Sequence, residues 1–486
     1  MPDVPPRAAL AAASRIHIDA LLDSVPELLD LAERMTAAGH EVALVGGSVR
    51  DAVRLGTAKD LDLATSARPQ EVLAVLAGWA DSVWDIGIAF GTVGARRGAH
   101  QFEITTYRSD AYDRASRKPE VTYGQSLLED LRRRDFTMNA MAVTLPDREF
   151  VDPFEGLVDL AAGRLRTPAT PQESFADDPL RMMRAARFVA QLGVDVAPEV
   201  RTAMLEMAQR ITMVSAERVR DELSALLLAA RPRPGLELLV DTGLADHVLP
   251  ELPALRLEID EHHRHKDVYE HSLIVLDQAI DLETSHEPAI EPDLVLRLAA
   301  LLHDIGKPRT RRFEHGGRVS FHHHEVVGAK LTRKRLTALR YPRQVIDEVS
   351  LLVELHLRFH GYGGGEWTDA AVRRYVRDAE DHLVALHKLT RADCTTRNPR
   401  KAAALRRTYD GLEARIGVLE QAEELASIRP DLDGTQIMAI LGIGPGPQVG
   451  QAYRWLLERR LDEGPLGAQR AEAELRGWWA SRRQAQ

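Results

Sequence analysis

The chain has 486 residues, which is too long for one ordinary domain and predicts three or four. Its hydrophobic content of 44% and charged content of 28% are typical of a globular protein, and no run of about 18 apolar residues predicts a membrane span. The net charge of −10 excludes a surface that is basic throughout, although local basic patches remain compatible with it.

The amino-terminal segment AALAAAS is too short, and too closely followed by charged residues, for a signal peptide. The single cysteine, Cys394, excludes an intrachain disulfide framework and fits a reducing compartment. We therefore expect a cytoplasmic protein.

Up to about residue 145, short β-like runs alternate with helical stretches, and the runs are EVALVGG, DLDLAT, QFEITTY and MNAMAVT. From about Ala176 onwards, long amphipathic segments such as DDPLRMMRAARFVAQLG and SAERVRDELSALLLAA dominate. The sequence therefore predicts an α+β chain, in which a head with a mixed sheet is followed by a mostly α-helical body.

The stretch LVGGSVRD ends an apolar strand in two adjacent glycines, Gly46 and Gly47. Glycines leave backbone N–H groups free to approach a ligand closely. The segment from Ser48 to Leu55 is predicted to be a helix whose positive dipole end lies at the glycines. This combination favours a phosphate site.

Asp60 and Asp62 follow at i and i+2, a spacing that places both carboxylates on one face of a strand, where they can share divalent cations. Glu103, in the strand-like segment QFEITTY, is expected to supply a third carboxylate. A two-metal site of this kind steers an attacking hydroxyl and neutralises a leaving pyrophosphate. We therefore predict nucleotide chemistry with these three carboxylates as catalytic residues.

The segment DDPLRMMRAARF places Asp178 and Arg181 at i and i+3 of a predicted helix, and therefore on one face. Cytosine and adenine both present an amino donor beside a ring-nitrogen acceptor, which a carboxylate and a guanidinium can bind together. Guanine and uracil present the reverse order and would leave this pair unsatisfied, which can reject a near-analogue by roughly 10⁴-fold. The pair can thus select C and A without a nucleic-acid template.

The motifs GGSVRD, KDLDLAT, FEITTYR, DLRRRDFTMNAMA and DDPLRMMRAARF follow one another in the order and spacing of the class II tRNA nucleotidyltransferases. The chain resembles the CCA-adding enzymes of that family, which share a polymerase-β-like head with bacterial poly(A) polymerases. The resemblance implies Mg²⁺ at Asp60 and Asp62, and tRNA, CTP and ATP as partners. One departure is Asp177-Asp178, where the family usually has Glu-Asp. The predicted nucleotide-binding residues are Gly46, Gly47, Ser48, Arg50, Arg134, Asp178, Arg181, Arg184 and Arg187.

A polar stretch between Tyr107 and Glu129 resembles the flexible loop with which CCA-adding enzymes switch from adding C to adding A. Family members that add only CC lack this loop. Its presence therefore favours full CCA addition, or addition of A alone, over CC addition.

Five later segments, HKDVYEHSLIV, LLHDIGKPRT, FHHHEVVGA, LHLRFHG and LTRADCTT, resemble an HD phosphohydrolase domain. Imidazole and carboxylate ligands together suit several divalent metals, so the residues do not specify which metal is bound. Such a centre can hydrolyse phosphoesters, including cyclic phosphates or 3′-phosphates at RNA ends. The implied core ligands are His271, His303, Asp304 and Asp393, with His324 and His356 as the extra histidines of two-metal members. The remaining histidines of this region, expected to be exposed or to lie behind the ligands, are His262, His263, His265, His322 and His323.

Two basic runs, from Lys307 to Arg343 and from Arg397 to Arg407, are predicted to form an electrostatic footprint for a polyanion. In the family that the chain resembles, the body and tail hold the tRNA elbow. Backbone contacts there are largely independent of sequence. The segment GIGPGPQVG resembles the tail motif of the same family and is also compatible with a turn between two helices.

We predict five parts: a helical extension over 1–30, a nucleotidyltransferase head over 31–165, a helical neck for base and RNA binding over 166–255, an HD body over 256–425 and a tail over 426–486. The favoured function is template-independent addition of C, C and A to the 3′ end of tRNA, with release of pyrophosphate. The alternatives are a poly(A) polymerase, an enzyme that adds only the terminal A, and a phosphohydrolase whose head serves to bind RNA. A pure scaffold would leave both metal constellations without a use.

Overall fold

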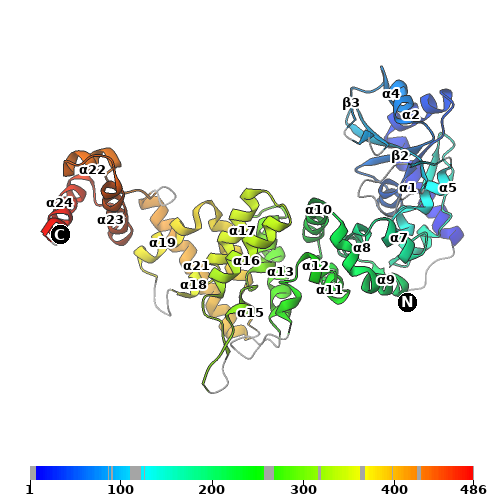
Figure 1. Ribbon diagram of the computed structural model, residues 1–486. Coiled ribbons are helices and arrows are strands. Elements are labelled where there is room, and N and C mark those ends of the chain that lie inside the picture. Colours follow the sequence, from blue (N-terminus) through cyan, green and yellow to red (C-terminus); the bar gives the residue numbers. More distant parts are fainter. Residues whose placement is uncertain are drawn as a thin grey trace. The chain divides into compact units, whose positions relative to one another are not determined.

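The computed structural model describes residues 7–85, 87–88, 91–109, 122–124, 126–256, 267–315, 319–361, 367–396, 398–423 and 428–484. The chain divides into two compact units, Met1–Val248 and Leu249–Gln486, which are described separately below (Figure 1). None of the helices in the described residues combines the length and the hydropathy that a membrane span needs.

The first unit is built on a seven-stranded sheet with the order β3-β4-β5-β2-β1-β8-β9. Strands β2 and β5 run parallel, and every other neighbouring pair is antiparallel, so the sheet is mixed, as predicted. The strands are β1 (Val42–Val45), β2 (Leu61–Thr65), β3 (Ser82–Trp84), β4 (Thr92–Arg97), β5 (His100–Thr106), β8 (Ala142–Leu145) and β9 (Phe150–Val151). Strand β8 is shorter than the predicted run MNAMAVT, because residues Thr137–Asn139 form a 3₁₀ turn, η2, instead.

Alternate residues of β1 belong to two different cores, as the two-residue period of a strand requires. Leu44 packs into the large core beneath helices α1 (Arg7–Ser24), α2 (Pro26–Ala37) and α4 (Pro69–Leu76). Val45 packs on the opposite face with Tyr107.

The predicted separate extension over 1–30 is not observed among the described residues. Helix α1 packs against α3 (Gly47–Leu55) and α6 (Gly156–Ala161), and it contributes Ile18 and Leu22 to the core of the head. The amphipathic first helix is therefore an integral part of the head.

The remainder of the first unit is helical. Helix α8 packs against α10 and α11, and a Cβ atom at Gly235 of α11 would lie 2.4 Å from the carbonyl oxygen of Ala186 on α8, so only glycine permits this close crossing. The elements are α5 (Leu127–Arg132), β10 (Arg164–Leu165), α7 (Pro171–Asp177), α8 (Leu180–Leu192), β11 (Asp195–Val196), α9 (Pro198–Met207), η3 (Ala208–Met213), α10 (Ala216–Leu227), α11 (Arg233–Asp241) and α12 (Ala245–Val248).

The second unit begins with a helical bundle in which α16 packs against α17, and α14 packs against α13, α17 and α20. Its elements are η4 (Pro253–Leu255), α13 (Val268–Ser285), α14 (Leu294–Leu302), α15 (Lys307–Thr310), β12 (Arg312–Phe313), β13 (Val319–Ser320), α16 (His324–Ala338), α17 (Arg343–Leu355), α18 (Arg358–Gly361), α19 (Asp369–Ala379), η5 (Glu380–His382), α20 (Leu383–Ala392) and α21 (Pro399–Ala422).

The last three helices, α22 (Gly434–Leu441), α23 (Pro447–Glu463) and α24 (Ala468–Gln484), have a small core of their own. Gly442, in a left-handed conformation, ends α22, and Pro447 begins α23. The segment GIGPGPQVG is therefore the turn between two helices that its composition allows. The core residues of this tail are Leu432, Ile437, Ala452, Leu456, Ala471 and Leu475.

Candidate active site and metal centre

The turn between β1 and α3 is shaped for close approach of a ligand. Gly46 has a φ of 70°, a left-handed conformation that favours glycine. A Cβ atom at Gly46 would lie 2.7 Å from Nη1 of Arg134, so any side chain would displace that guanidinium. Gly47 begins α3, whose unsatisfied first N–H groups carry the positive end of the helix dipole. The predicted phosphate site therefore has both a close backbone approach and a basic neighbour.

Ser48 connects this turn to the aspartate strand. Its Oγ donates a hydrogen bond of 2.8 Å to the carbonyl oxygen of Asp60 and accepts one of 2.8 Å from the backbone N–H of Asp62. The hydroxyl of Ser48 therefore positions the segment that carries the two aspartates, and its predicted contact with the nucleotide stays a prediction.

Asp62 and Glu103 lie directly opposite each other on the parallel strands β2 and β5, so their side chains share one face of the sheet. Asp60 lies just before β2, and both Asp60 and Glu103 are exposed. Burial raises the pKa of Asp62 to about 6, and the negative charges of Glu103 and Asp60 add to that shift. Arg134 and Arg50 act in the opposite direction. A divalent cation would relieve this repulsion. In the described residues, however, the three carboxylates do not bring their oxygens within 4.8 Å of one another, so the metal site in the head stays a prediction.

Two arginines of the predicted nucleotide site are held by neighbouring acids. Arg50 donates to both carboxylate oxygens of Asp51, at 2.8 and 2.9 Å, and its Nη1 donates to Oδ1 of Asn139 at 2.8 Å. Arg134 donates from Nε and Nη2 to Asp130, at 3.2 and 3.0 Å. Bidentate pairs fix the plane of a guanidinium, so both cations are oriented before any ligand arrives.

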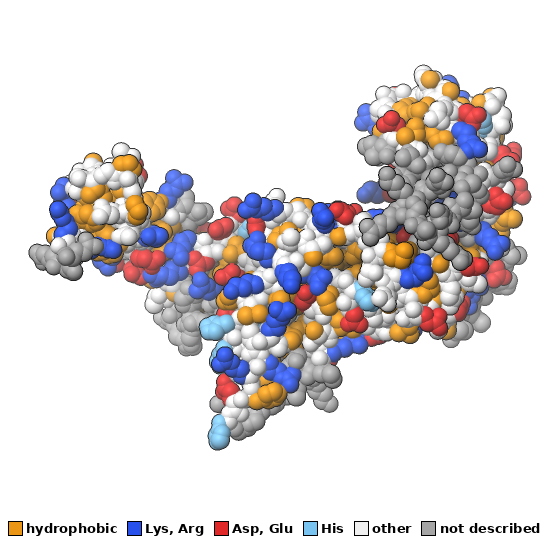
Figure 2. Space-filling model, in the orientation of Figure 1, with side chains coloured by type: hydrophobic (Ala, Val, Ile, Leu, Met, Phe, Trp, Pro, Cys, Tyr) orange, Lys and Arg blue, Asp and Glu red, His pale blue; other side chains and the backbone are white. Residues whose placement is uncertain are grey.

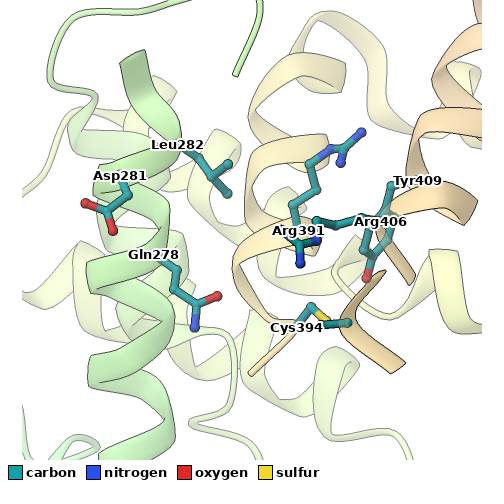
Figure 3. Close-up of a pocket in the computed structure, with 8 residues that line it drawn as sticks. Gln278, Asp281, Leu282, Arg391, Cys394, Arg406 and Tyr409 are labelled. Atoms are coloured by element: carbon teal, nitrogen blue, oxygen red, sulfur yellow. The ribbon is translucent and has the colours of Figure 1, made fainter. Parts of the chain in front are cut away.

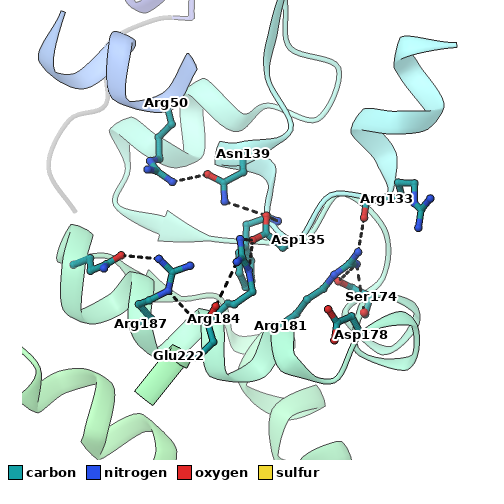
Figure 4. A network of polar contacts seen from close by, with 12 residues as sticks. Arg50, Arg133, Asp135, Asn139, Ser174, Asp178, Arg181, Arg184, Arg187 and Glu222 are labelled. Carbon is teal, nitrogen blue, oxygen red and sulfur yellow. Dashed lines mark hydrogen bonds and ion pairs between the residues drawn. The ribbon is translucent and has the colours of Figure 1, made fainter. Parts of the chain in front are cut away.

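A chain of polar contacts joins the head to the helices that follow it (Figure 4). Arg184 of α8 donates to Oδ2 of Asp135 at 2.6 and 2.8 Å, and Asn139 donates to Oδ1 of the same carboxylate at 3.0 Å. Burial alone would raise the pKa of Asp135, but Arg184 and these hydrogen bonds outweigh it and lower the pKa to about 2. On the other side, Glu222 of α10 accepts from Nε of Arg187 at 2.7 Å.

The ring of Phe188 lies among three of these arginines. The guanidinium carbons of Arg187, Arg50 and Arg184 lie 4.5, 5.4 and 5.5 Å from its centroid. The ring also packs edge-on against Phe136, with centroids 5.7 Å apart. Cation–π contacts of this kind hold like charges together next to a phosphate or base site.

Asp178 and Arg181 do not share a helix face, contrary to the prediction. Helix α7 ends at Asp177 and α8 begins at Leu180, while Asp178 is extended, with φ −142° and ψ 100°. The reason is Pro179, because the residue before a proline is disfavoured in the helical conformation. The carboxylate of Asp178 accepts from the N–H of Leu180 at 3.1 Å and from Arg218 of α10 at 2.7 Å.

Arg181 is held by different partners. It donates to Oγ of Ser174 at 2.9 Å and to the carbonyl oxygen of Arg133 at 2.5 Å. Figure 4 shows Asp178 and Arg181 side by side at the beginning of α8, each fixed from outside the pair. A carboxylate and a guanidinium that are not bonded to each other are both available to a base edge, as the selection hypothesis needs.

Sequence reasoning missed the residues that organise this site. Asp135 and Asn139 carry a signal, because they lie at i and i+4 directly after Arg134 in the stretch RRRDFTMN. Glu222 carries none, because it comes from a separate helix, α10, 35 residues beyond Arg187. Within the loop predicted between Tyr107 and Glu129, residues 110–121 and 125 lie outside the described residues. The ends pair as the antiparallel strands β6 (Arg108–Ser109) and β7 (Thr122–Tyr123).

In the second unit, the six predicted metal ligands come together at the ends of helices of one bundle. In the described residues, two groups bring all their ligand atoms within 4.8 Å of one another, and together they contain all six. The groups are His271 with His303 and Asp393, and Asp304 with His324 and His356. The structure therefore brings the six residues together, and their role as metal ligands stays a prediction.

Backbone carbonyls fix the orientation of three of these imidazoles. The Nδ1 atoms of His303, His324 and His356 donate to the carbonyl oxygens of Ala300, Phe321 and Val353, at 2.8, 2.8 and 2.7 Å. A carbonyl only accepts, so each Nδ1 carries the ring proton and each Nε2 keeps its lone pair.

The Nε2 atoms of these imidazoles converge on other polar atoms of the group. Nε2 of His324 lies 3.2 Å from Oδ1 of Asp304, and Nε2 of His303 lies 3.3 Å from Nε2 of His271. In the described part of the chain, the buried Nε2 atoms of His324 and His356 have no hydrogen-bond partner. Buried acceptors in contact require a cation, so the residues fit a divalent metal centre.

The pKa shifts of the histidines in this group are consistent with a site for a divalent metal. Burial would lower the pKa of His303, but Asp304 and Asp393 outweigh burial and raise it, which shows that the centre is electronegative. Burial lowers the pKa of His356 to about 3, so its ring stays neutral, as a metal ligand must be. Lys307, which the prediction did not include, is buried and places its Nζ 2.9 Å from Oδ2 of Asp304. The sequence could have indicated this contact, because Lys307 lies three residues after Asp304 in the stretch HDIGK.

The other expectations for this unit are met in part. His322 and His323 are exposed, as expected, whereas His262, His263 and His265 lie outside the described residues. The first basic run is partly neutralised: Arg333 and Arg343 pair with Asp347, and Arg335 pairs with Glu251. In the second run, Arg397 is outside the described residues.

A cavity of about 270 Å³ lies in the second unit (Figure 3). Cys394, which directly follows the ligand Asp393, lies on its wall, and burial raises the pKa of the thiol. Arg391 also lines the cavity, but Asp410 and Glu413 already hold its guanidinium at 2.7 and 2.9 Å. The cavity therefore adds little uncompensated charge. Its walls come from α13, α20, α21 and the loop after α20, through Gln278, Asp281, Leu282, Arg391, Cys394, Ala402, Arg406 and Tyr409.

Three protein-family models match the chain in order. They describe a poly A polymerase head domain over residues 42–166, a probable RNA- and SrmB-binding site of polymerase A over 193–255, and an HD domain over 268–398. They follow the order of the predicted head, neck and HD body, whose limits stay a prediction.

Among known proteins, the chain is 36% identical over 447 residues to an A-adding tRNA nucleotidyltransferase of Deinococcus radiodurans, covering 90% of this chain and 95% of that protein. It is 38% identical over 247 residues to a CCA-adding enzyme of Streptococcus gordonii and 39% identical over 234 residues to one of Anoxybacillus flavithermus. These two matches span 60% and 57% of the length of the CCA-adding relatives.

Solved structures share the fold. The Bacillus stearothermophilus CCA-adding enzyme in complex with CTP matches with a TM-score of 0.64 at 24% identity, covering 95% of this chain and 99% of that one. The Thermotoga maritima CCA-adding enzyme complexed with tRNA matches with a TM-score of 0.57 at 18% identity, covering 92% and 94%. The predicted α+β architecture is thereby confirmed.

Proposed function

The chain belongs to the tRNA nucleotidyltransferase family, and on that premise we propose that it adds C, C and A to the 3′ end of tRNA from CTP and ATP. The observation that carries the proposal is the gathering of Asp60, Asp62 and Glu103 beside the Gly46 turn, with Arg50 and Arg134 held next to it. Such an arrangement can hold a nucleoside triphosphate by its phosphates and present its α-phosphate to an attacking hydroxyl.

The residues divide this work between them. The N–H groups at the start of α3, together with Arg50 and Arg134, bind the triphosphate and offset the negative charge that builds up on the leaving pyrophosphate. Asp60 and Asp62 would hold divalent cations, which we propose to be Mg²⁺ and which would supply Lewis-acid activation of the hydroxyl and the phosphate when bound. The RNA 3′ oxygen forms the new bond to the α-phosphorus as the bond to pyrophosphate breaks. Ser48 keeps the two aspartates at the distance from the turn that this geometry needs.

Base selection is assigned to the beginning of α8. Asp178 can accept a hydrogen bond from the exocyclic amino group of C or A, and Arg181 can donate to the adjacent ring nitrogen. Arg218 and Ser174 hold these two groups from outside, so neither collapses onto the other in the absence of a base. Preorganised donors and acceptors of this kind reject G and U by leaving polar groups unpaired.

A second candidate is addition of the terminal A alone. It is favoured by the relative whose likeness extends over 90% of this chain, an A-adding enzyme. Both candidates use the same three carboxylates, and both use Asp178 and Arg181 to select the base. They differ in which tRNA 3′ end the enzyme accepts.

For the second unit we propose metal-dependent hydrolysis of phosphoesters at RNA ends. The converging Nε2 atoms and the buried carboxylates of Asp304 and Asp393 supply a ligand set for one or two divalent cations. Lys307, already in contact with Asp304, adds a positive charge for a phosphate oxygen. In the reaction, a water oxygen bonds to phosphorus, the ester P–O bond breaks and the protons of water pass to the products.

The test is a mapping of products at single-nucleotide resolution on two tRNA transcripts, one lacking CCA and one already ending in CC. Each is incubated with CTP, with ATP or with both, in the presence of Mg²⁺. We expect C, C and then A on the first transcript and a single A on the second. A product only from the CC-ended transcript would move the assignment to the A-adding enzymes, and long A tails would indicate a poly(A) polymerase.

A further inference from the structure

We propose that strands β12 and β13 form an arm that binds single-stranded RNA and leads its end to the metal centre of the second unit. This hairpin arm consists of Arg311, Arg312, Phe313, Glu314 and His315, with the returning residues Val319 and Ser320. The inference rests on the proposed phosphoester hydrolysis and extends it by naming the substrate class and the surface that receives it.

The arm carries an aromatic ring in solvent. Phe313 is 73% exposed, more than any other large apolar side chain in the described residues, and the other exposed ones are all aliphatic. Single exposed aliphatic residues are common on proteins, but a nearly bare aromatic ring on a two-stranded hairpin has little packing to stabilise it. The ring is therefore available to a partner that stacks on it.

One guanidinium lies against this ring, and a second lies on the other face of the hairpin. The guanidinium carbon of Arg311 lies 4.7 Å from the centroid of Phe313. Arg312 pairs with Ser320 and Phe313 pairs with Val319, so by the alternation of a strand Arg312 faces the opposite side of the hairpin. From Lys307 to His315 the sequence has four Lys or Arg residues against Glu314 alone. Figure 2 shows basic and histidine side chains gathered around this projection of the surface.

An exposed aromatic ring beside one guanidinium, with another on the opposite face of the hairpin, matches single-stranded nucleic acid. Proteins bind single strands by stacking bases on aromatic side chains and by drawing the phosphates along basic groups, largely without regard to sequence. A duplex would hide its base faces from Phe313, and an acidic peptide would not use the ring as a stacking platform. The chemistry of the arm therefore favours an unpaired RNA strand.

Both strands of the arm start from the metal centre. The first strand leaves α15, whose Lys307 contacts the ligand Asp304 (Figure 1). The second returns to Phe321, whose carbonyl oxygen accepts from Nδ1 of the ligand His324. Val319, opposite Phe313, is five residues from His324, so the chain between them spans at most about 18 Å. A base stacked on the arm thus places the following phosphates within reach of the centre.

The roots of the arm are rigid. A Cβ atom at Gly306 would lie 2.1 Å from the carbonyl oxygen of His324, so the segment before the arm packs directly on the segment after it. Substitutions at exposed positions such as Phe313 and Arg312 should leave this packing, and the ligands behind it, in place.

The experiment compares two substrates of the full chain with Mn²⁺ added: a ten-nucleotide single-stranded RNA with a 3′-phosphate, and p-nitrophenyl phosphate, which is too small to reach the arm. We expect Phe313→Ala to raise KM for the RNA roughly 5- to 100-fold, the range typical of one lost stacked base. The rate with p-nitrophenyl phosphate should not change. Phe313→Trp should restore the RNA KM, Phe313→Leu should not, and Val418→Ala, another exposed apolar position in this unit, serves as the matched control.

Three results would distinguish a failure of the RNA-binding proposal from a failure of the proposed hydrolysis. Equal loss with both substrates in Phe313→Ala would mean that the ring only supports the centre, and would overturn the proposal. Hydrolysis of neither substrate by the wild type would remove the proposed activity, and the arm is then tested by fluorescence anisotropy of the same RNA in EDTA. Weaker binding by Phe313→Ala, and by Arg311→Ala with Arg312→Ala, would support an RNA arm in that case. Unchanged affinity would overturn it.

Discussion

The carboxylate of Asp62 is the residue on which the account of the head depends most, because it faces Glu103 across the sheet and its backbone is held by Ser48. We expect Asp62→Ala, and equally Asp60→Ala, to lower nucleotide addition on the order of 10³-fold or more, since charge compensation at the reacting phosphate is lost. Binding of tRNA should stay within about twofold. Single-turnover addition and filter binding measure the two quantities, with the exposed Asp147→Ala as the matched control. Full activity in either aspartate variant would contradict the metal assignment.

The raised pKa of Asp62 gives metal binding a pH dependence. Burial and the neighbouring carboxylates raise the pKa of this residue to about 6, so below pH 6 a cation must displace a proton before it can bind. The affinity of the head for Mn²⁺ should therefore hold steady above pH 7 and fall about tenfold per pH unit below 6. Calorimetry at pH 5 and 7.5 measures this, in a His303→Ala background that removes the second metal centre. Equal affinities at the two pH values would contradict the shift.

We propose that Asp178 and Arg181 select the bases. Replacing both with alanine should relax the choice among the four nucleotides. Binding of G or U would then no longer leave a carboxylate and a guanidinium without hydrogen-bond partners. The measurement is the relative kcat/KM for each nucleotide on a tRNA lacking CCA, with Arg201→Ala as a control on a neighbouring helix. Unchanged selectivity for C and A would refute the proposed role.

At the level of single residues, the sequence indicated candidate site residues but did not indicate the residues that hold them in position. Asp60, Asp62 and Asp178 could be singled out because each lies in a motif whose residue types and spacing, taken together, are typical of few other functions. Ser48 was assigned to the nucleotide, whereas its hydroxyl clamps two backbone groups, a geometry that only the folded turn creates. Arg218 could not be predicted as the partner of Asp178, because 40 residues and a change of helix separate them.

Helix α8 is the element that connects the two halves of the active site. Its Arg184 binds Asp135 of the head, and its Arg187 binds Glu222 of α10, so one helix aligns the base-reading segment with the phosphate turn. The sequence predicted the helix and its basic face correctly. It placed the start too early, because Asp178 precedes a proline and is forced out of the helix.

The Asp135–Arg184 pair should stabilise this junction. The pKa of Asp135 falls from 3.8 to about 2 on folding, which corresponds to about 2 kcal/mol of unfolding free energy. Because the folded pKa is the lower one, that contribution is fully present above pH 4 and is lost as the pH falls towards 2. Asp135→Asn should therefore speed hydrogen exchange in α8 at pH 7 more than at pH 3, and Asp195→Asn, at an exposed strand end, should not. An equal effect of Asp135→Asn at both pH values would contradict the pair's contribution.

On the scale of the whole molecule, the two proposed metal sites lie in two separately packed units. Each site was predicted because some of its expected ligands lie in a short motif, DLD in one unit and HDIG in the other. Such motifs can be recognised in the sequence without knowledge of the fold. What the sequence could not supply is the packing between distant segments. Helix α1 was predicted to stand apart, yet Leu22 lies in the core of the head, because amphipathic patterning indicates a buried face without indicating its partner.

The separation of the units predicts that the activities are independent. His303→Ala removes a buried side chain of the proposed metal centre and should abolish phosphoester hydrolysis, while leaving nucleotide addition within about twofold, since its hydrogen-bond contacts with Ala300 and His271 lie within the second unit. Asp62→Ala should do the reverse. The two assays on both variants form a complete cross-test, and loss of addition in His303→Ala would show that the second centre supports the first.

The most direct test of the central claim is competition among nucleotides. A tRNA transcript lacking its CCA end is incubated with all four nucleoside triphosphates and Mg²⁺, and the 3′ ends of the products are sequenced. The account predicts products that end in C, C and A and stop there, because the carboxylate and guanidinium at the start of α8 read the amino edge shared by those two bases. Incorporation of G or U, tails of A alone, or no extension would contradict it.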